Sequence, residues 1–140
     1  MNYQKIIAVD FDGCLCTNNW PGIGEPNWKA IWELIRRKSE GDKIILWTCR
    51  DGEQLKDAVL WCTNHGLQFD SVNENLPENV ARFGNNSRKI YATEYWDDKA
   101  VRIAADDNKP IIHTSVYRKR KTVFQFIKRC FLSLIRKKRG

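Results

Sequence analysis

The chain has 140 residues, 42 % of them hydrophobic, which suits one ordinary hydrophobic core and is too short for two independent domains. Residues 1–10 lack the features of a signal peptide, and no apolar run approaches the ~20 residues of a membrane-spanning helix, so we expect a cytoplasmic protein. The formal net charge of +7 comes from residues 118–140, which hold 10 of the 24 Lys and Arg residues and no acid. Residues 1–117 keep 14 basic and 17 acidic side chains, a formal charge of −3, and we expect them to form the folded domain.

The first half of the chain begins with a predicted strand, a helix and a second strand. Residues 5–10 and 43–48 are short apolar runs, rich in β-branched residues, that each end on a polar side chain, as buried parallel strands do. The helix between them is expected to end before Gly41. Its apolar stripe at helical spacing consists of Trp28, Ile31, Trp32 and Ile35.

A second helix is predicted over residues 52–65. Asp51 and Gln54 have the spacing of a capping box at its start, and Gly66 stands where a helix commonly ends. Its apolar face consists of Leu55, Ala58, Val59 and Cys62. Packing in the core is the expected role of most tryptophans, namely Trp28, Trp32, Trp47 and Trp61. Trp20 is the exception, because it lies in a loop after the first strand and is expected over the cleft.

The second half of the chain is less regular. Residues 67–72 give a weak strand, and residues 73–88 read as a polar loop with a helical turn near 77–83. Residues 90–96 form an apolar run, and residues 110–113 suggest a last edge strand. Strands that alternate with helices predict an open α/β fold with a parallel sheet and right-handed crossovers.

Polar side chains follow several of these predicted strands. Because ligands of open α/β sheets bind beyond the carboxyl ends of the strands, where the strand order reverses, we expect these side chains to share one cleft. They are Asp10, Asp12, Thr48, Asp97 and Asp98.

The carboxylates of Asp10 and Asp12 would repel each other at the exit of a buried strand unless a cation or a proton relieved the pair. Mg²⁺ suits such a site, since it prefers oxygen ligands and is often held by carboxylates together with a substrate phosphate, and Asp97 or Asp98 can complete the set. Asp10 could then attack a phosphoryl group. Asp12 is the candidate acid/base that protonates the leaving oxygen and later takes a proton from water.

A phosphoryl group in transit also needs hydrogen-bond donors and a fixed positive charge. Thr48 and Lys89 are the candidates for these roles. The backbone amides around residues 11–14, together with that of Cys49, could form an anion-binding nest, in which Gly13 allows close approach. The phosphate- or substrate-binding candidates are therefore Phe11, Gly13, Cys49 and Arg50.

The order of these motifs resembles that of the haloacid dehalogenase (HAD) superfamily. Asp10-Phe-Asp12-Gly13 after an apolar strand resembles the first motif, and Ile44-Ile-Leu-Trp-Thr48 resembles the second. Lys89 resembles the third motif, and the segment that ends in Asp97-Asp98 resembles the fourth. The resemblance covers roughly residues 5–103.

The resemblance implies a Rossmannoid three-layer sandwich with a central parallel sheet, a Mg²⁺ cofactor and an aspartyl-phosphate intermediate. It also implies that Asp10, the backbone carbonyl of Asp12 and a carboxylate of the fourth motif surround the metal, with Asp97 as first choice. An acid at both Asp10 and Asp12 favours a phosphatase over a dehalogenase. Cys14 departs from the usual Thr or Val, and we expect no chemistry from it.

The short chain resembles a small capless bacterial and phage branch of these hydrolases. Residues 14–27 and 73–88 are only loop-sized, so no cap domain fits and the cleft should be open. An open cleft suits a macromolecular phosphate or a site completed by another subunit, and the sequence does not reveal the oligomeric state.

Each of these residues also has a simpler interpretation. Thr48 alone could be a sheet residue or a helix cap, and Lys89 a solvated charge. Arg50 could contact substrate or form an ion pair. Asp106-Asp107 is a rival to Asp97-Asp98, although a helix end or turn fits it better. The five cysteines are expected to be reduced, and the two histidines are not at zinc-ligand spacing from Cys14 and Cys16.

Residues 118–140 place Val123, Ile127, Phe131 and Leu134 on one helical stripe between two basic blocks. A basic amphipathic C-terminal helix of this kind could lie on anionic lipid, which would make the protein peripheral to a membrane, or could bind nucleic-acid phosphates. It could also pack on the domain with solvated charges.

The sequence therefore predicts a Mg²⁺-dependent phosphomonoester hydrolase acting on a small or macromolecular phosphate. Two alternatives remain at this stage. One is a nucleotide or polynucleotide end-processing phosphatase, which the open cleft and basic tail favour. The other is a non-catalytic module that docks to membrane or nucleic acid through its tail.

Overall fold

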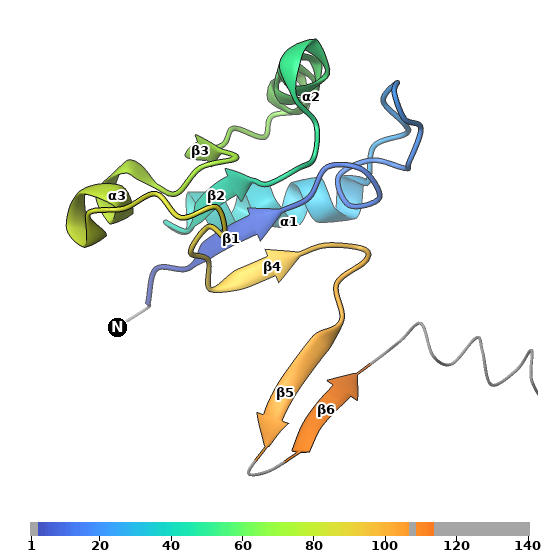
Figure 1. Ribbon diagram of the computed structural model, residues 1–140. Helices are drawn as coiled ribbons and strands as arrows, with labels where there is room; N and C mark the ends of the chain where they lie inside the picture. Colours follow the sequence, from blue (N-terminus) through green and yellow to red (C-terminus); the bar gives the residue numbers. More distant parts are fainter. Residues whose placement is uncertain (1–2, 107–108, 114–140) are drawn as a thin grey trace, which may run out of the picture. The chain divides into compact units, whose positions relative to one another are not determined.

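The computed structural model describes residues 3–106 and 109–113, and the chain divides into two compact units, residues 1–99 and 100–140. The first unit contains a four-stranded sheet in the order β3-β2-β1-β4, in which every neighbouring pair is parallel (Figure 1). Its strands are β1 (Ile6–Val9), β2 (Lys43–Leu46), β3 (Ser71–Val72) and β4 (Glu94–Trp96). Its helices are α1 (Trp28–Ser39), α2 (Gly52–Asn64) and α3 (Pro77–Phe83).

The two central strands, β1 and β2, are apolar because both faces of the sheet are covered there. Ile7 pairs with Ile44 and Val9 with Leu46, so these four side chains share one face and join the main core. Ala8 and Ile45 alternate to the other face and join a second, smaller core. A parallel sheet buried on two sides is a Rossmann-like α/β arrangement, as the alternating strands and helices predicted.

Helices α1 and α2 cover the face of the main core. Ala58 and Cys62 of α2 are buried there, as their helical spacing predicted. Helix α1 contributes Ile31 and Leu34, and its first turn is capped by the Asn27 side chain, which accepts a hydrogen bond from the Ala30 amide.

The predicted apolar stripe of α1 was wrong for its two tryptophans. Trp28 and Trp32 are 42 % and 64 % exposed, because the buried face of the helix centres on Ile31 and Leu34 and leaves both indoles outside it. The Trp28 ring packs on Trp32 at 5.7 Å and on His65 at 5.2 Å between ring centroids. Trp47 and Trp61 do pack against the cores, as expected.

The opposite face of the sheet is covered by the segment that contains α3, through Leu76 and Ile90. The helical turn expected near 77–83 is α3 itself. Asn75 fixes the segment that follows α3, since its side-chain amide donates to the Asn86 side chain and the Ser87 carbonyl and accepts from the Tyr91 amide. This segment returns the chain to β4 on the far side of β1 (Figure 1).

Three local predictions differ from the structure. The strands expected over residues 67–72 and 90–96 are limited to β3 and β4, because only their last residues pair with the sheet. The capping box at α2 is also wrong: the Asp51 side chain makes no capping hydrogen bond. The left-handed backbone of Gly52, with φ +52°, follows Asp51 directly, whereas a capping box needs helical dihedrals at that position.

The second unit contains a hairpin of β5 (Arg102–Asp106) and β6 (Lys109–His113), paired antiparallel. The edge strand expected at residues 110–113 is therefore not part of the parallel sheet, because it pairs with the strand just before it. Of the rival pair Asp106-Asp107, for which a helix end or turn was expected, Asp106 ends β5, so a helix end is wrong there, and Asp107 lies outside the described residues. The predicted boundary at residue 117 and the basic helix of residues 118–140 lie outside the described residues. Among the described residues, no helix has the length and apolar character needed to cross a membrane.

Candidate functional site

The candidate site lies at the carboxyl edge of the sheet, where the strand order reverses. Chain order runs from β1 through β2 to β3 on one side, and β4 then pairs with the opposite side of β1. One further hydrogen bond, from the Asp10 amide to the Trp96 carbonyl at 2.9 Å, holds the ends of β1 and β4 together. Residues that follow these two strands must therefore meet, which is the position where open α/β sheets bind ligands.

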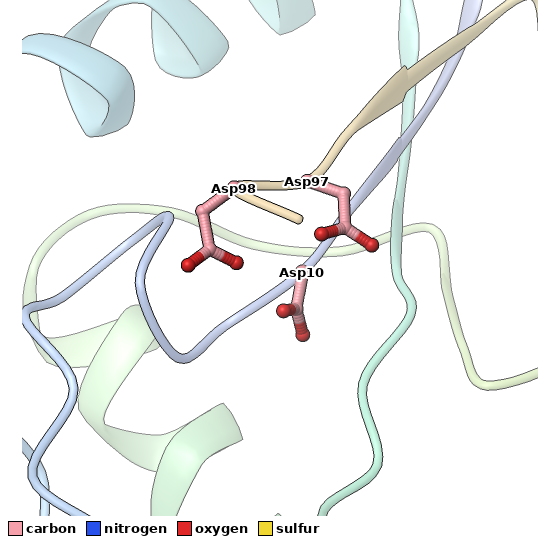
Figure 2. Close-up of side chains that lie close together, drawn as sticks. All are labelled: Asp10, Asp97 and Asp98. Atoms are coloured by element: carbon pink, nitrogen blue, oxygen red, sulfur yellow. The ribbon is translucent and has the colours of Figure 1, made fainter. Parts of the chain in front are cut away.

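Three carboxylates converge at this position. One oxygen from each of Asp10, Asp97 and Asp98 lies within 4.8 Å of the others. Figure 2 shows that Asp10 reaches the cluster from the end of β1, whereas Asp97 and Asp98 come from the turn after β4. The structure thus brings together three of the four predicted metal-ligating residues.

Burial and like charge act together on Asp10. Its partly buried carboxyl loses hydration, which is the main reason that its pKa is raised above the ordinary value of 3.8. The Phe11 amide, which donates to Asp10 Oδ1 at 2.8 Å, opposes this shift, while the charges of Asp97, Asp12 and Asp98 add to it. A cation among these oxygens would relieve the repulsion, and an all-oxygen donor set fits a hard ion such as Mg²⁺.

Gly13 makes room for one of the three acids. It has φ +86°, which favours glycine, and a Cβ atom built there would lie 2.5 Å from Oδ2 of Asp98. The Asp98 carboxylate therefore rests against the backbone of the turn after β1. Gly13 was predicted to allow close approach of a phosphate, whereas in the structure the group that approaches it closely is the Asp98 carboxylate.

The Asp12 side chain does not join the acidic cluster. Its two oxygens accept hydrogen bonds from Arg50, from Nε at 2.8 Å and from Nη2 at 2.7 Å. This fork-to-fork pair fixes the carboxylate plane. Coordination of a metal by the Asp12 backbone carbonyl stays a prediction.

The Arg50 side chain is only 2 % exposed, and its guanidinium donates several hydrogen bonds within the site. Besides holding Asp12, it donates to the carbonyls of Pro21 at 3.2 Å and Gly22 at 2.6 Å. Its guanidinium carbon lies 4.9 Å from the Phe11 ring centroid. The hydrogen bonds that Arg50 donates to Asp12 raise the pKa of Arg50 above its ordinary value, so the residue stays cationic. Of the two interpretations of Arg50, the structure shows the ion pair.

The loop after β2 places Thr48 and Cys49 at the same edge of the sheet. The Thr48 hydroxyl accepts from the Arg50 amide at 3.2 Å, so its own proton is available to a ligand. Cys49 is exposed. The loop is held by Asn73, whose side chain accepts from the Thr48 amide at 2.8 Å.

Asn73 was not among the predicted site residues, although the sequence contains a weak signal for it. Asn73 follows β3 as Asp10 follows β1, and it adopts φ +53°, a conformation that asparagine tolerates better than most residues. Its position after a predicted strand could have added it to the set of polar strand ends.

Lys89 is the one predicted catalytic residue that the described contacts do not connect to the acids. Its ammonium lies 5.9 Å from the centroid of the Tyr95 ring, and it forms no ion pair within residues 3–106. Phe11 was predicted to bind phosphate, but its side chain is fully buried in the main core and its amide donates to Asp10 Oδ1, so neither group is free for that role. Burial raises the pKa of the Cys14 thiol to about 11, which agrees with an unreactive residue there.

Comparison with known proteins gives one informative relative. The chain matches no protein-family model and no curated protein. It is similar to a solved structure of a conserved protein from Bacteroides thetaiotaomicron, with 38 % sequence identity and a TM-score of 0.63, over 70 % of this chain and 78 % of that one. Identity of this size over most of both chains shows common descent as well as a shared fold, and the chain belongs to the same family as this conserved Bacteroides protein.

Proposed function

We propose that the chain is a Mg²⁺-dependent phosphomonoester hydrolase of the HAD type that works through an aspartyl-phosphate on Asp10. The observation that carries the proposal is that Asp10, Asp97 and Asp98 meet at the edge of a parallel sheet where the strand order reverses. Asp12, two residues after Asp10, is held beside them by Arg50. The relative from Bacteroides thetaiotaomicron is described only as a conserved protein and indicates no activity. The resemblance to the HAD superfamily also supports the proposal, because Asp10, Thr48, Lys89 and Asp97 follow one another in the order of its four motifs.

Asp10, Asp97 and Asp98 would hold the metal. When bound, Mg²⁺ supplies positive charge that offsets the repulsion between an anionic phosphate and anionic carboxylates. An oxygen of Asp10 then attacks phosphorus, and the bond from phosphorus to the leaving oxygen breaks. Asp12, when protonated, gives its proton to that leaving oxygen, so the alcohol departs neutral.

Water must then cleave the aspartyl-phosphate. Asp12, now a carboxylate, takes a proton from the attacking water, the bond between phosphorus and Asp10 breaks, and inorganic phosphate leaves. The bidentate pair with Arg50 uses one lone pair on each Asp12 oxygen and leaves others free for this proton transfer. We expect the Thr48 hydroxyl and the Asp12 and Cys49 amides to donate to phosphate oxygens. The other amides of the predicted nest are engaged elsewhere, since those of Phe11, Gly13 and Cys14 donate to Asp10 Oδ1, the Cys16 carbonyl and the Phe11 carbonyl.

The test of this proposal is release of phosphate from para-nitrophenyl phosphate by the full chain. We expect turnover with Mg²⁺ and none after addition of a chelator, with recovery when Mg²⁺ is restored in excess. Because the proposal requires an oxygen-ligated metal, turnover that is unaffected by chelation would contradict it.

Gly13→Ala is expected to weaken Mg²⁺ binding by about 10–100-fold, the usual effect of disturbing a group that orients a metal ligand. The new Cβ atom would collide with the Asp98 carboxylate and push it away from its two partners. Isothermal titration of the protein with MgCl₂ measures the change.

Gly84→Ala is the matched control for Gly13→Ala. Gly84 also has a positive φ, of +70°, but a Cβ atom there meets nothing within 4 Å. Both variants therefore carry backbone strain, and only one disturbs Asp98. Equal Mg²⁺ affinities in the two variants would remove Asp98 from the metal site.

A further inference from the structure

Residues 17–25 form a loop beside the site that is fixed at its base. The Thr17 amide donates to the Glu25 carbonyl at 2.9 Å, and the Glu25 amide donates to the Thr17 hydroxyl at 2.9 Å. A Cβ atom at Gly24 would collide with the Thr17 carbonyl, so only glycine fits there. The two ends of the loop are thus held together by hydrogen bonds and by close backbone packing at Gly24.

The tip of the loop is fastened to the acid/base pair. Arg50 donates to the carbonyls of Pro21 and Gly22, and the same guanidinium holds Asp12. The guanidinium carbon also lies 5.1 Å from the centroid of the Trp20 ring. One buried cation therefore connects the Trp20 indole directly to the carboxylate that would protonate the leaving group.

Trp20 is 59 % exposed even though Arg50 contacts its ring. The other exposed tryptophans behave differently, since Trp28 and Trp32 pack on each other. In the part of the chain that the structure describes, no second aromatic ring packs on Trp20. A large apolar ring that is held in place and left open to solvent beside a reaction site offers a stacking surface to a ligand.

The chemistry of this surface selects the ligand. A flat indole stacks well on a planar heteroaromatic group such as a nucleobase. Such stacking does not depend on which base is present, because every base has a π-face. In a nucleotide, a sugar separates the phosphate ester oxygen from the base. With the leaving oxygen beside Asp12, a base can extend past Arg50 to Trp20.

We propose that Trp20 stacks on the base of a nucleotide whose phosphate lies at Asp10. This inference rests on the proposed function for the position of the phosphate. It assigns the leaving group as a nucleoside, either free or at the end of a strand.

The test compares ligands and variants in binding, so that it does not depend on turnover. In the presence of Mg²⁺, adenosine 5′-monophosphate and ribose 5-phosphate are titrated calorimetrically into the full chain carrying Asp10→Asn. Both ligands have the same phosphate and sugar, and only the nucleotide has a base. We expect the nucleotide to bind more tightly than ribose 5-phosphate. Trp20→Ala should lower the affinity for the nucleotide by about 5–150-fold and leave the affinity for ribose 5-phosphate unchanged.

Trp20→Phe keeps a flat ring and is expected to retain most of the affinity for the nucleotide. Trp32→Ala removes an indole of similar exposure from α1 and is expected to change neither affinity. Equal binding of the two ligands, or equal losses in Trp20→Ala and Trp32→Ala, would overturn the assignment. Neither result would touch the phosphatase proposal, which is decided by phosphate release from para-nitrophenyl phosphate.

A 5′-phosphorylated oligonucleotide separates the two sources of the base. Tighter binding than that of the mononucleotide, lost in Trp20→Ala, supports the stacking site and assigns the base to a strand end. Equal binding that is lost in the same variant supports the site and assigns a free nucleotide.

Discussion

Asp10→Asn is expected to abolish phosphate release, with a loss of activity on the order of 10⁴-fold or more, as when other covalent nucleophiles are removed. The amide cannot form the acyl-phosphate, and it also removes one of the three carboxylates of the cluster. Single-turnover assays with para-nitrophenyl phosphate and Mg²⁺ measure the loss. The fold should be retained, because the Asp10 backbone, rather than its side chain, bonds to the Trp96 carbonyl.

Asp57→Asn provides the matched control for this variant. It makes the same chemical change at an exposed residue of α2 that is not part of the acidic cluster, and it should leave turnover intact. The native protein should also trap phosphate covalently after acid quenching, whereas Asp10→Asn should not. Substantial turnover by Asp10→Asn would rule out the aspartyl-phosphate mechanism.

Arg50→Met is expected to lower both stability and activity. It leaves the Asp12 carboxylate without its partner and two backbone carbonyls without a donor. Breaking a buried ion pair from one side typically costs about 3–5 kcal/mol in the free energy of unfolding. Loss of a correctly oriented acid/base should reduce kcat by about 10²–10⁴-fold. Urea unfolding and steady-state kinetics measure the two effects.

Two further variants separate charge from geometry at this position. Arg50→Lys keeps the positive charge but loses the planar fork, so we expect it to recover part of the stability and little of the kcat. The double variant Asp12→Asn/Arg50→Met removes both charges and should be more stable than Arg50→Met alone. Arg36→Met, at an exposed arginine of α1 paired with two glutamates, should have little effect on either quantity. Native-like kcat in Arg50→Met would show that Asp12 does not need its partner.

The parts of the fold that followed from sequence were those with a strong local pattern. Helix α2 begins at the first residue of its predicted range and ends one residue before its end, because its apolar spacing and Gly66 both mark it. The meeting of Asp10 with Asp97 and Asp98 was also predictable, since each follows a strand and parallel strands end at one edge. That prediction needed only the positions of the strands in the sequence and no knowledge of tertiary contacts.

The remaining features depend on tertiary contacts that have no local pattern. The pairing of Arg50 with Asp12 joins residues from two different loops, and nothing in either segment specifies the partner. The exposure of Trp28 and Trp32 depends on how α1 is rotated on the sheet, which an apolar stripe with tryptophans on its edge does not determine. Asn73 matters through its backbone conformation, which spacing does not reveal.

The strand order also has a consequence for how the protein is made. β1 is synthesised well before its partner β4, as the bond from the Ile6 amide to the Thr93 hydroxyl 87 residues along the chain illustrates. Such non-local parallel pairing forms slowly, because a long loop must close before any contact rewards it. Between the synthesis of β1 and that of β4, a nascent chain therefore carries Asp10 and Asp12 without the acids that complete the cluster. The acidic cluster is complete only when the last strand of the parallel sheet is in place.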